Sequence, residues 1–407
     1  MMTEKNTTAT QSCKEASSNK PSLYNHGEII SLQQFTDLIL SQSVDKISAL
    51  KLFTLSYDMP PNEGNARAIH RHLLSLSDQG VSIMVAVDNT YGRRVAPKSD
   101  LPRPIARLRG EGKVIEDVKK TQAELQQHKN IHLVFNGSEN PPVFPLSKID
   151  HRKLLLVYDK NGNPDAAVIF GSSVNYHFDS DESIGSSIYL SDPAVLRWLD
   201  EYSKTPHYTA PTQINTGAIT ITTRELVKGG NELADREITS LIDSARNSLI
   251  FSAQWVPDGK IFEAISKAAA RGVNISVYSN FPPIKREPLY SPIRKKAVHQ
   301  LSRIARKTGN LHFFIPCNPS LFIHLNALIA DTDSPTHAKA ITGTDNMSNE
   351  LMMKLGMRET LLTLNDPLMV KKFIDYVKTH LIPRVKEYRF DAASSSERIL
   401  PRDHKLF

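Results

Sequence analysis

A histidine and a lysine stand two residues apart at the start of a run that otherwise predicts a buried strand. Residues 151–159 read HRKLLLVYD, in which His151 and Lys153 precede four aliphatic residues. Side chains at positions i and i+2 of a strand point to the same face. This spacing predicts an imidazole and an ammonium side by side at the rim of a sheet. A strand that simply starts at the protein surface would show the same polar pair, so the rest of the chain must decide.

The second half of the chain repeats this segment. Residues 322–331 read FIHLNALIAD, with His324 placed 173 residues after His151 and Asp331 ending the run as Asp159 does. In both copies a turn-rich stretch and a further strand follow, and that strand ends in small residues. These turns read GSSVN at 171–175 and GTDN at 343–346. A duplicated unit is therefore predicted.

The elements that must position these residues repeat as well. Each copy opens with an apolar strand, a helical pattern that ends in glycine, and a second strand beginning at Val81 or Val273. Strands that alternate with helices predict α/β layers around buried sheets. The predicted order is a disordered tail, a first half, a linker, a second half and a polar extension, at residues 1–24, 25–207, 208–220, 221–390 and 391–407.

Two equivalent strand ends can meet across a pseudo-twofold axis, which would bring His151 and His324 to one site. The neighbouring side chains predicted there are rich in hydrogen-bond donors, which suits a phosphate group. They are Lys153, Ser172, Ser173, Asn175, Thr344 and Asn346. One histidine could attack phosphorus while the other protonates the leaving oxygen. Glu182 and Glu359 either fix the far nitrogens of these imidazoles or are ordinary strand-edge residues.

The paired motifs resemble those of the phospholipase D superfamily, H-x-K-x4-D followed by G-S-x-N. The matching segments are HRKLLLVYD with GSSVN and HLNALIAD with GTDN, and the resemblance covers roughly residues 30–390. It implies two homologous α/β/α sandwich halves and phosphodiester cleavage through a covalent phosphohistidine. It also implies that no metal or other cofactor is needed. Catalytic roles would fall to six residues: His151, Lys153, Asp159, His324, Asn326 and Asp331.

Three departures from the family pattern bear on this resemblance. Asp159 lies one residue too far from His151, with Tyr158 in the expected place, and a bulge could absorb the difference. The turn GSSVN is one residue longer than G-S-x-N. Asn326 stands where the second lysine is expected. The missing cation would leave His324 more readily protonated, which suits a general acid, or would mark a half that has lost its activity.

The net charge of +7 is concentrated in two segments. Residues 92–113 carry a net charge of +5 and residues 285–307 carry +7, so the remaining chain sums to −5. At 291–307 the basic residues flank the apolar residues Ile293, Val298, Leu301 and Ile304, a pattern that suits an anionic membrane surface. Nucleic acid is the alternative partner, and solvated helix faces would show the same charge.

The sequence lacks a signal peptide and an apolar stretch long enough to span a membrane, which predicts a cytoplasmic or peripheral membrane protein. Two cysteines, Cys13 and Cys317, do not suggest a disulfide framework. The favoured function is hydrolysis or transfer of phospholipid head groups. A nuclease of the same superfamily and a non-catalytic phosphate-binding protein are the alternatives, and no stable protein partner is predicted.

Overall fold

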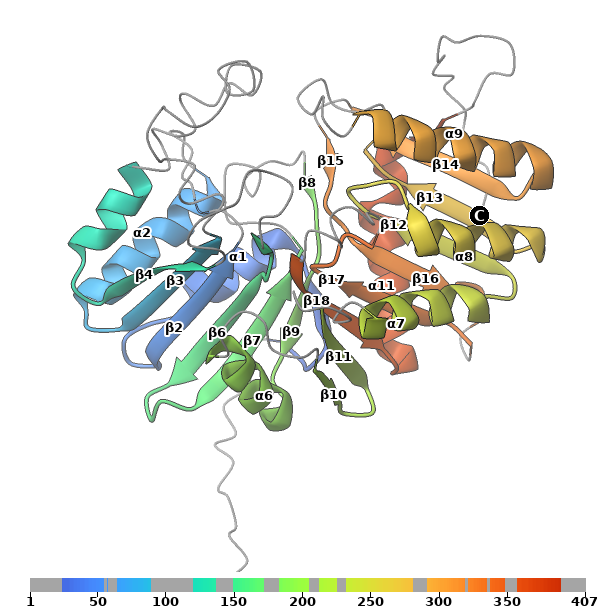
Figure 1. Ribbon diagram of the computed structural model, residues 1–407. Helices are drawn as coiled ribbons and strands as arrows, with labels where there is room; N and C mark the ends of the chain where they lie inside the picture. The colour runs from blue at the N-terminus through green and yellow to red at the C-terminus, as the bar shows by residue number, and fades with distance from the viewer. Residues whose placement is uncertain are drawn as a thin grey trace, which may run out of the picture.

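The computed structural model contains two large β-sheets that lie side by side, with helices on their faces (Figure 1). The structure describes residues 24–54, 57, 64–88, 120–136, 149–171, 183–204, 212–224, 232–280, 291–318, 321–334, 337–347 and 357–388. The basic segment 92–113 lies outside these residues. No helix of the described part is long and apolar enough to cross a membrane.

The first sheet has seven strands in the order β1-β9-β7-β6-β2-β3-β4. Their bounds are Glu28–Ile30 for β1, Ser187–Leu190 for β9, Pro164–Phe170 for β7, Leu154–Asp159 for β6, Ile47–Thr54 for β2, Ser82–Asp88 for β3 and Ile131–Asn136 for β4. Helices that pack on this sheet include α1 (Leu32–Leu40), α2 (Asn65–Asp78) and α6 (Pro193–Lys204). Ser31 begins α1 with a capping box, since its side chain accepts from the backbone of Gln34 and its own backbone donates to the Gln34 side chain.

The second sheet follows the same plan, in the order β10-β11-β18-β17-β16-β12-β13-β14-β19. The bounds are Gln213–Asn215 for β10, Ile219–Arg224 for β11, Met357–Leu364 for β18, Lys339–Gly343 for β17, Ala327–Ala330 for β16, Ser248–Ser252 for β12, Asn274–Tyr278 for β13, Leu311–Pro316 for β14 and Val385–Glu387 for β19. Its helices are α7 (Glu232–Ser244), α8 (Gly259–Ala270), α9 (Ser291–Thr308), α11 (Pro367–His380) and the short 3-10 helix η2 (Ile382–Arg384).

Strand order and direction confirm that the two halves are homologous. β2, β3 and β4 are parallel, as are β12, β13 and β14, and β6 and β16 run antiparallel to the first strand of each set. Leu154 pairs with Ile169 in one sheet, and Ala327 pairs with Thr342 in the other, so equivalent residues are 173 positions apart here. β10 and the start of β11 fall within residues 208–220, so part of the predicted linker belongs to the second sheet.

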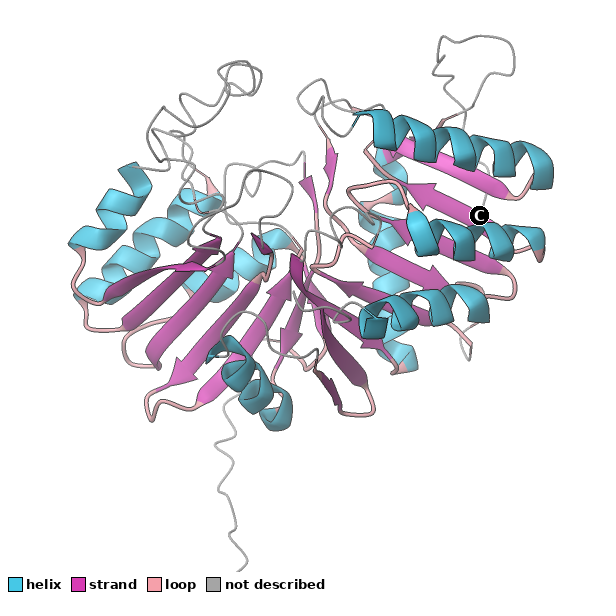
Figure 2. Ribbon diagram, viewed as in Figure 1, coloured by secondary structure: helices cyan, strands magenta, loops and turns pink. Residues whose placement is uncertain are grey.

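The apolar side chains form three layers around the two sheets. One core lies between the first sheet and helices α1 and α2, and another lies between the second sheet and helices α7, α8 and α9. The third core contains α6 and α11 together with residues from both sheets. Figure 2 shows the helices covering the sheets of both halves. Because β6 and β16 are covered on both faces, their sequences are almost uninterrupted runs of apolar residues.

Two short strand pairs join the halves directly. β5 (Ile149–Asp150) from the first half is parallel to β18, and β15 (Phe322–Ile323) from the second half is parallel to β8 (Ser183–Ile184). His151 donates its backbone N–H to Arg358, and His324 donates its backbone N–H to Ile184. Each motif histidine therefore directly follows a strand that is paired with the opposite half, as the predicted pseudo-twofold arrangement requires.

The packing of helix α9 changes the interpretation of its basic, amphipathic sequence. Val298 and Leu301 are buried in the core of the second half, and Ile304 packs against the same core. The described part of the apolar face is therefore already covered by the protein and is not available to insert into a bilayer. What remains exposed on this helix is a row of basic side chains that includes Lys296, Arg303, Arg306 and Lys307.

Candidate active site

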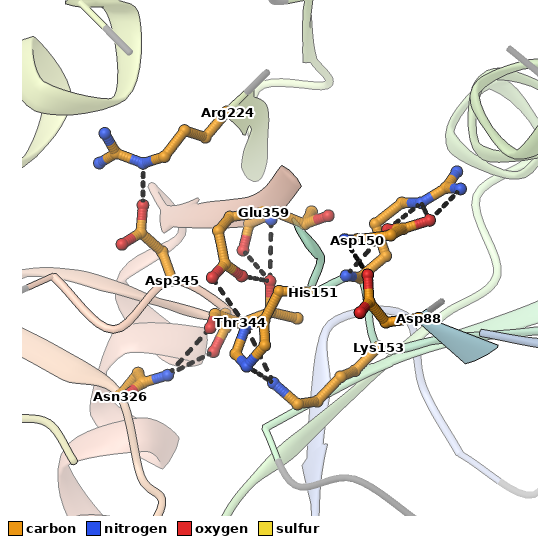
Figure 3. Close-up of polar contacts among 12 residues, drawn as sticks. Asp88, Asp150, His151, Lys153, Arg224, Asn326, Thr344, Asp345 and Glu359 are labelled. Carbon is orange, nitrogen blue, oxygen red and sulfur yellow. Dashed lines mark hydrogen bonds and ion pairs between the residues drawn. The ribbon is translucent and has the colours of Figure 1, made fainter. Parts of the chain in front are cut away.

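His151 lies in a buried polar cluster built from both halves (Figure 3). Its Nδ1 atom is 2.7 Å from Oε1 of Glu359, although the two groups are not aligned as a hydrogen bond. The Nζ atom of Lys153 is 3.1 Å from Nε2 and 3.3 Å from Nδ1 of the same ring. Glu359 belongs to β18 of the opposite half, so this cluster exists only because the two sheets meet.

Thr344 fixes the other oxygen of Glu359. Its hydroxyl donates a hydrogen bond of 2.6 Å to Oε2, and the same hydroxyl accepts one of 2.9 Å from the backbone N–H of Thr360. Both side chains are at most 2% exposed. A threonine hydroxyl has one hydrogen to donate, so the bond from Thr360 leaves that hydrogen for the carboxylate. The carboxylate is thus held in one orientation toward His151.

Burial and neighbouring charges tune the ionisable groups of this cluster. Burial, and secondly the Lys153 ammonium, hold the pKa of His151 well below its ordinary value of 6.5. Burial also lowers the pKa of Lys153 to about 8. The pKa of Glu359 is raised well above 4.5, mainly because its carboxylate is buried. His151 is therefore a neutral imidazole at neutral pH, the form that can attack phosphorus.

A second buried ion pair supports the turn that carries Thr344. Nε of Arg224 donates 2.7 Å to Oδ2 of Asp345, and the backbone N–H of Met347 donates 2.8 Å to Oδ1. Met347 has a φ of 47°, an unusual conformation for a methionine. Asp345 and Arg224 therefore hold the turn that follows β17, next to the His151 cluster (Figure 3).

The equivalent positions around His324 carry different residues. The strand registers place Asn326 at the position of Lys153 and Gly171 at the position of Thr344. Asp150 pairs with Arg358 and Ile323 pairs with Ile184, which makes Gly185 the equivalent of Glu359. Glu182, expected to match Glu359, is therefore three residues out of register. The cation and the carboxylate that contact His151, and the hydroxyl that binds this carboxylate, all lack counterparts at these positions.

His324 nevertheless lies at the boundary between the halves. A Cβ atom added to Gly171 would lie 3.1 Å from the His324 carbonyl oxygen, a tight contact that glycine avoids. Asn326 donates from Nδ2 to the carbonyl oxygens of Gly343 and Thr344, at 3.4 Å and 3.2 Å. Both acceptors are carbonyls, which fixes the orientation of this amide and leaves its buried Oδ1 without a hydrogen-bond partner.

Neither motif aspartate contacts the cluster, so we propose structural roles for both in place of the predicted catalytic ones. Asp159 is at the far end of β6 from His151, where Oδ1 accepts from the backbone N–H groups of Asn161 and Asn163. Asp331 follows β16, and its Oδ1 accepts from the backbone of Arg246, Asn247 and Ser248. A strand of six residues is about 20 Å long, so a carboxylate at its far end cannot contact the histidine.

The predicted bulge is also placed differently. β6 is regular, and the register shifts lie opposite it, between Ile47 and Ala49 of β2 and between Pro164 and Ala166 of β7. The neighbouring strands, and not the motif strand, therefore contain the additional residues. Asn346 is buried in the turn after Thr344. Ser172, Ser173, Asn175 and Glu182 lie outside the described residues.

Sequence reasoning missed the residues that support the cluster from outside the motifs. Asp345 stands inside GTDN and could have been noticed as a carboxylate in a turn of donors. Arg224 ends the otherwise polar-apolar strand ITITTR, and nothing in that pattern links it to Asp345, 121 residues away. No group of histidine, cysteine, aspartate or glutamate side chains suited to a metal ion occurs among the described residues.

Comparison with solved structures identifies the fold. No protein-family model matches the chain, and no curated protein is similar to it in sequence. Phosphatidylserine synthase from Haemophilus influenzae Rd KW20 is similar in structure with a TM-score of 0.63 and 11% identity, covering 88% of this chain and 86% of that one. Polyphosphate kinase from Porphyromonas gingivalis gives a TM-score of 0.52 and 13% identity over 90% of this chain.

The chain spans about half the length of that polyphosphate kinase, covering 52% of it. Nuc from Salmonella typhimurium, a phospholipase D family member, is a third similar structure, with a TM-score of 0.32 and 17% identity over 42% of this chain and 99% of that one. The chain has the phospholipase D-like fold, with two α/β halves, which confirms the fold predicted from the paired motifs.

The aspartates provide a test of structural against chemical roles. Replacing Asp331 with alanine removes an acceptor for three backbone N–H groups and puts alanine at a φ of 56°. We expect a loss of about 2–4 kcal/mol in the free energy of unfolding. Asp159→Ala should cost about 1 kcal/mol, because the backbone N–H groups of Asn161 and Asn163 can then bind water. Denaturant unfolding measures both, and a selective loss of turnover without destabilisation would restore the catalytic interpretation.

The pKa of Lys153 predicts the upper pH limit of activity. Its ammonium can stabilise a developing negative charge only while it is protonated, and its pKa of about 8 means that the charge is lost as the pH rises through that value. Turnover should therefore decline above about pH 8. Arginine keeps its charge throughout this range, so Lys153→Arg should move the decline to higher pH in whatever activity it retains. A pH–rate profile that is the same in both proteins would assign the decline to another group.

Proposed function

We propose that this protein is a phosphodiesterase of the phospholipase D type that cleaves or transfers phospholipid head groups. In the first step Nε2 of His151 attacks phosphorus, a P–N bond forms, and the P–O bond to the leaving group breaks. His324 gives its proton to the leaving oxygen. In the second step His324 takes a proton from water or an alcohol, whose oxygen attacks phosphorus and releases His151.

The unequal surroundings of the two histidines carry this assignment. His151 contacts a lysine and a carboxylate, and its pKa is held low, so its neutral form predominates. Asn326, Gly171 and Gly185 occupy the positions that would give His324 the same support. A nucleophile needs the first environment, whereas a general acid needs only a proton and a position near the leaving oxygen.

The charge of the cluster favours a diester over a chain of phosphates. Among the described residues that contact the His151 ring, Lys153 is the one cation. A phosphodiester carries a single negative charge, which one cation can accommodate. A polyphosphate carries one charge or more on every phosphate, and its binding would call for several cations around the nucleophile.

One observation supports a lipid over a nucleic acid, and a second is compatible with both. The phosphatidylserine synthase is similar to this chain over most of both lengths, which supports a lipid substrate by analogy of fold. The exposed basic residues of α9 can attract the negative surface of a membrane without inserting into it. The same residues could bind the backbone of a nucleic acid, so the substrate must be decided by its products.

The test combines product analysis with mapping of the intermediate. The purified protein is incubated with mixed phospholipids and, separately, with single-stranded and duplex nucleic acid, and the products are identified by mass spectrometry. We expect head-group release or exchange from phospholipid. Rapid quenching should give a phospho-adduct on His151, and His151→Ala should lose turnover by at least about a thousandfold.

Each result has a defined alternative. Nucleotide products would replace the lipid function with that of a nuclease. An adduct found only on His324 would reverse the roles of the two histidines, and full activity in His151→Ala would refute the site. Inactivity on both classes of substrate would leave the phosphate-binding protein as the remaining function.

Asn326 tests whether the second half is weakened but still works. Lysine at this position could donate to the carbonyls of Gly343 and Thr344 that the amide now contacts, and it would add a charge for the transition state. We expect Asn326→Lys to raise turnover by about tenfold, equivalent to about 1.4 kcal/mol. Asn326→Met, of similar size but without a donor, is the control and should lower turnover. A lower rate in the lysine variant would show that asparagine suits the substrate of this protein better than lysine does.

A further inference from the structure

We propose that Tyr202 is a positioning residue, which holds the two halves in the register that places Glu359 beside His151. Tyr202 lies in the last turn of α6 and is 5% exposed. It contacts neither His151 nor Glu359 in any described interaction. It contacts instead Arg152 and Arg358, the residues next to them in the chain.

The alternation of side chains along extended segments explains this arrangement. Neighbouring residues on an extended chain point to opposite faces. Arg152 follows His151 and Arg358 precedes Glu359, and the two segments are joined by the bond from the His151 N–H to the Arg358 carbonyl. One face of this junction therefore carries the histidine and the carboxylate. The other face carries two arginines, one from each half.

Tyr202 binds both arginines at once. Its carbonyl oxygen accepts 3.3 Å bonds from Nη1 of Arg152 and from Nη2 of Arg358. Its hydroxyl accepts a 3.2 Å bond from Nε of Arg358. The two guanidinium carbons lie 5.3 Å and 4.4 Å from the centre of its ring, which places both cations within the range of cation–π attraction.

Further hydrogen bonds hold the side chain of Arg152 in one conformation. The Asp150 carboxylate accepts from Nε of Arg152 at 2.9 Å and from Nη2 at 2.7 Å. The Asp150 backbone N–H donates a 2.7 Å bond to the Asp88 side chain. The two arginines and two aspartates are each at most 4% exposed. Because an unpaired charge is costly in such surroundings, these groups retain one arrangement. A displacement of Arg358 would move the adjoining Glu359 with it.

The experiment must separate positioning from general stability. Tyr202→Leu removes the ring and hydroxyl but leaves the backbone carbonyl. Tyr202→Phe removes the hydroxyl alone and keeps the variant close to the native fold. Tyr278→Leu is the matched control, because Tyr278 is equally buried in the second sheet but stacks on Phe314 and not on an arginine.

The kinetic test is a double-mutant cycle with Glu359→Gln, which rests on the proposed function. If Tyr202 acts through Glu359, Tyr202→Leu should lower kcat by about 100-fold in the native background and by no more than about threefold when Glu359 is already replaced. Tyr202→Phe should show a smaller loss with the same dependence. Tyr278→Leu should lower kcat by the same factor in the native background and in Glu359→Gln.

A second measurement needs no substrate. NMR titration of the His151 imidazole, assigned with His151→Gln, should show protonation at higher pH in Tyr202→Leu than in the native protein. The reason is that burial is the main cause of the low pKa, and a loosened junction admits water. The titration in Tyr278→Leu should match the native one.

The two measurements distinguish a failure of the Tyr202 proposal from a failure of the proposed function. Additive losses in the cycle, together with an unchanged His151 titration in folded Tyr202→Leu, would overturn the proposal. If the native protein turns over no phosphodiester, the proposed function fails, and the NMR titration alone decides the role of Tyr202. An unchanged titration in folded Tyr202→Phe and Tyr202→Leu would then refute it.

Discussion

The contact between His151 and Glu359 is the interaction on which the rest of the site depends. Each residue comes from a different half, and both are almost fully buried. Neither half alone could hold these groups, since an isolated carboxylate or imidazole in an apolar interior costs several kcal/mol. Polar contacts offset part of that cost, since Lys153 contacts the ring and Thr344 donates a hydrogen bond to the carboxylate. The pairing of β5 with β18 is therefore as important to the chemistry as the motif residues themselves.

The pseudo-twofold symmetry of the fold makes the asymmetry of the site informative. The central strands have the same order in both halves, so each residue that contacts His151 has a defined equivalent near His324. Three such equivalents are an asparagine and two glycines. A duplicated fold can divide two roles between its halves in this way, because the backbone that places both histidines is preserved while the side chains that tune them diverge.

The junction between the halves has two faces with different functions. One face carries the polar cluster around His151, and the other carries two arginines bound to Tyr202. α6 supplies that tyrosine, and α6 and α11 belong to the core that both sheets share. The packing of this central core therefore bears directly on the distance between a proposed nucleophile and its carboxylate. The helices α1, α2, α7, α8 and α9 pack on the outer faces of the two sheets.

The sequence by itself determined the duplicated α/β fold, the paired histidines and the departure at Asn326. These features are local patterns of apolar residues, glycines and short motifs, which repeat at a fixed spacing. Tertiary structure alone decided that Asp159 and Asp331 anchor backbone turns, and that Gly185 and not Glu182 matches Glu359. It also decided that Arg152 and Arg358 meet at Tyr202. These features depend on strand register and on contacts between residues far apart in the chain, and a shift of one residue would reverse the face of each side chain.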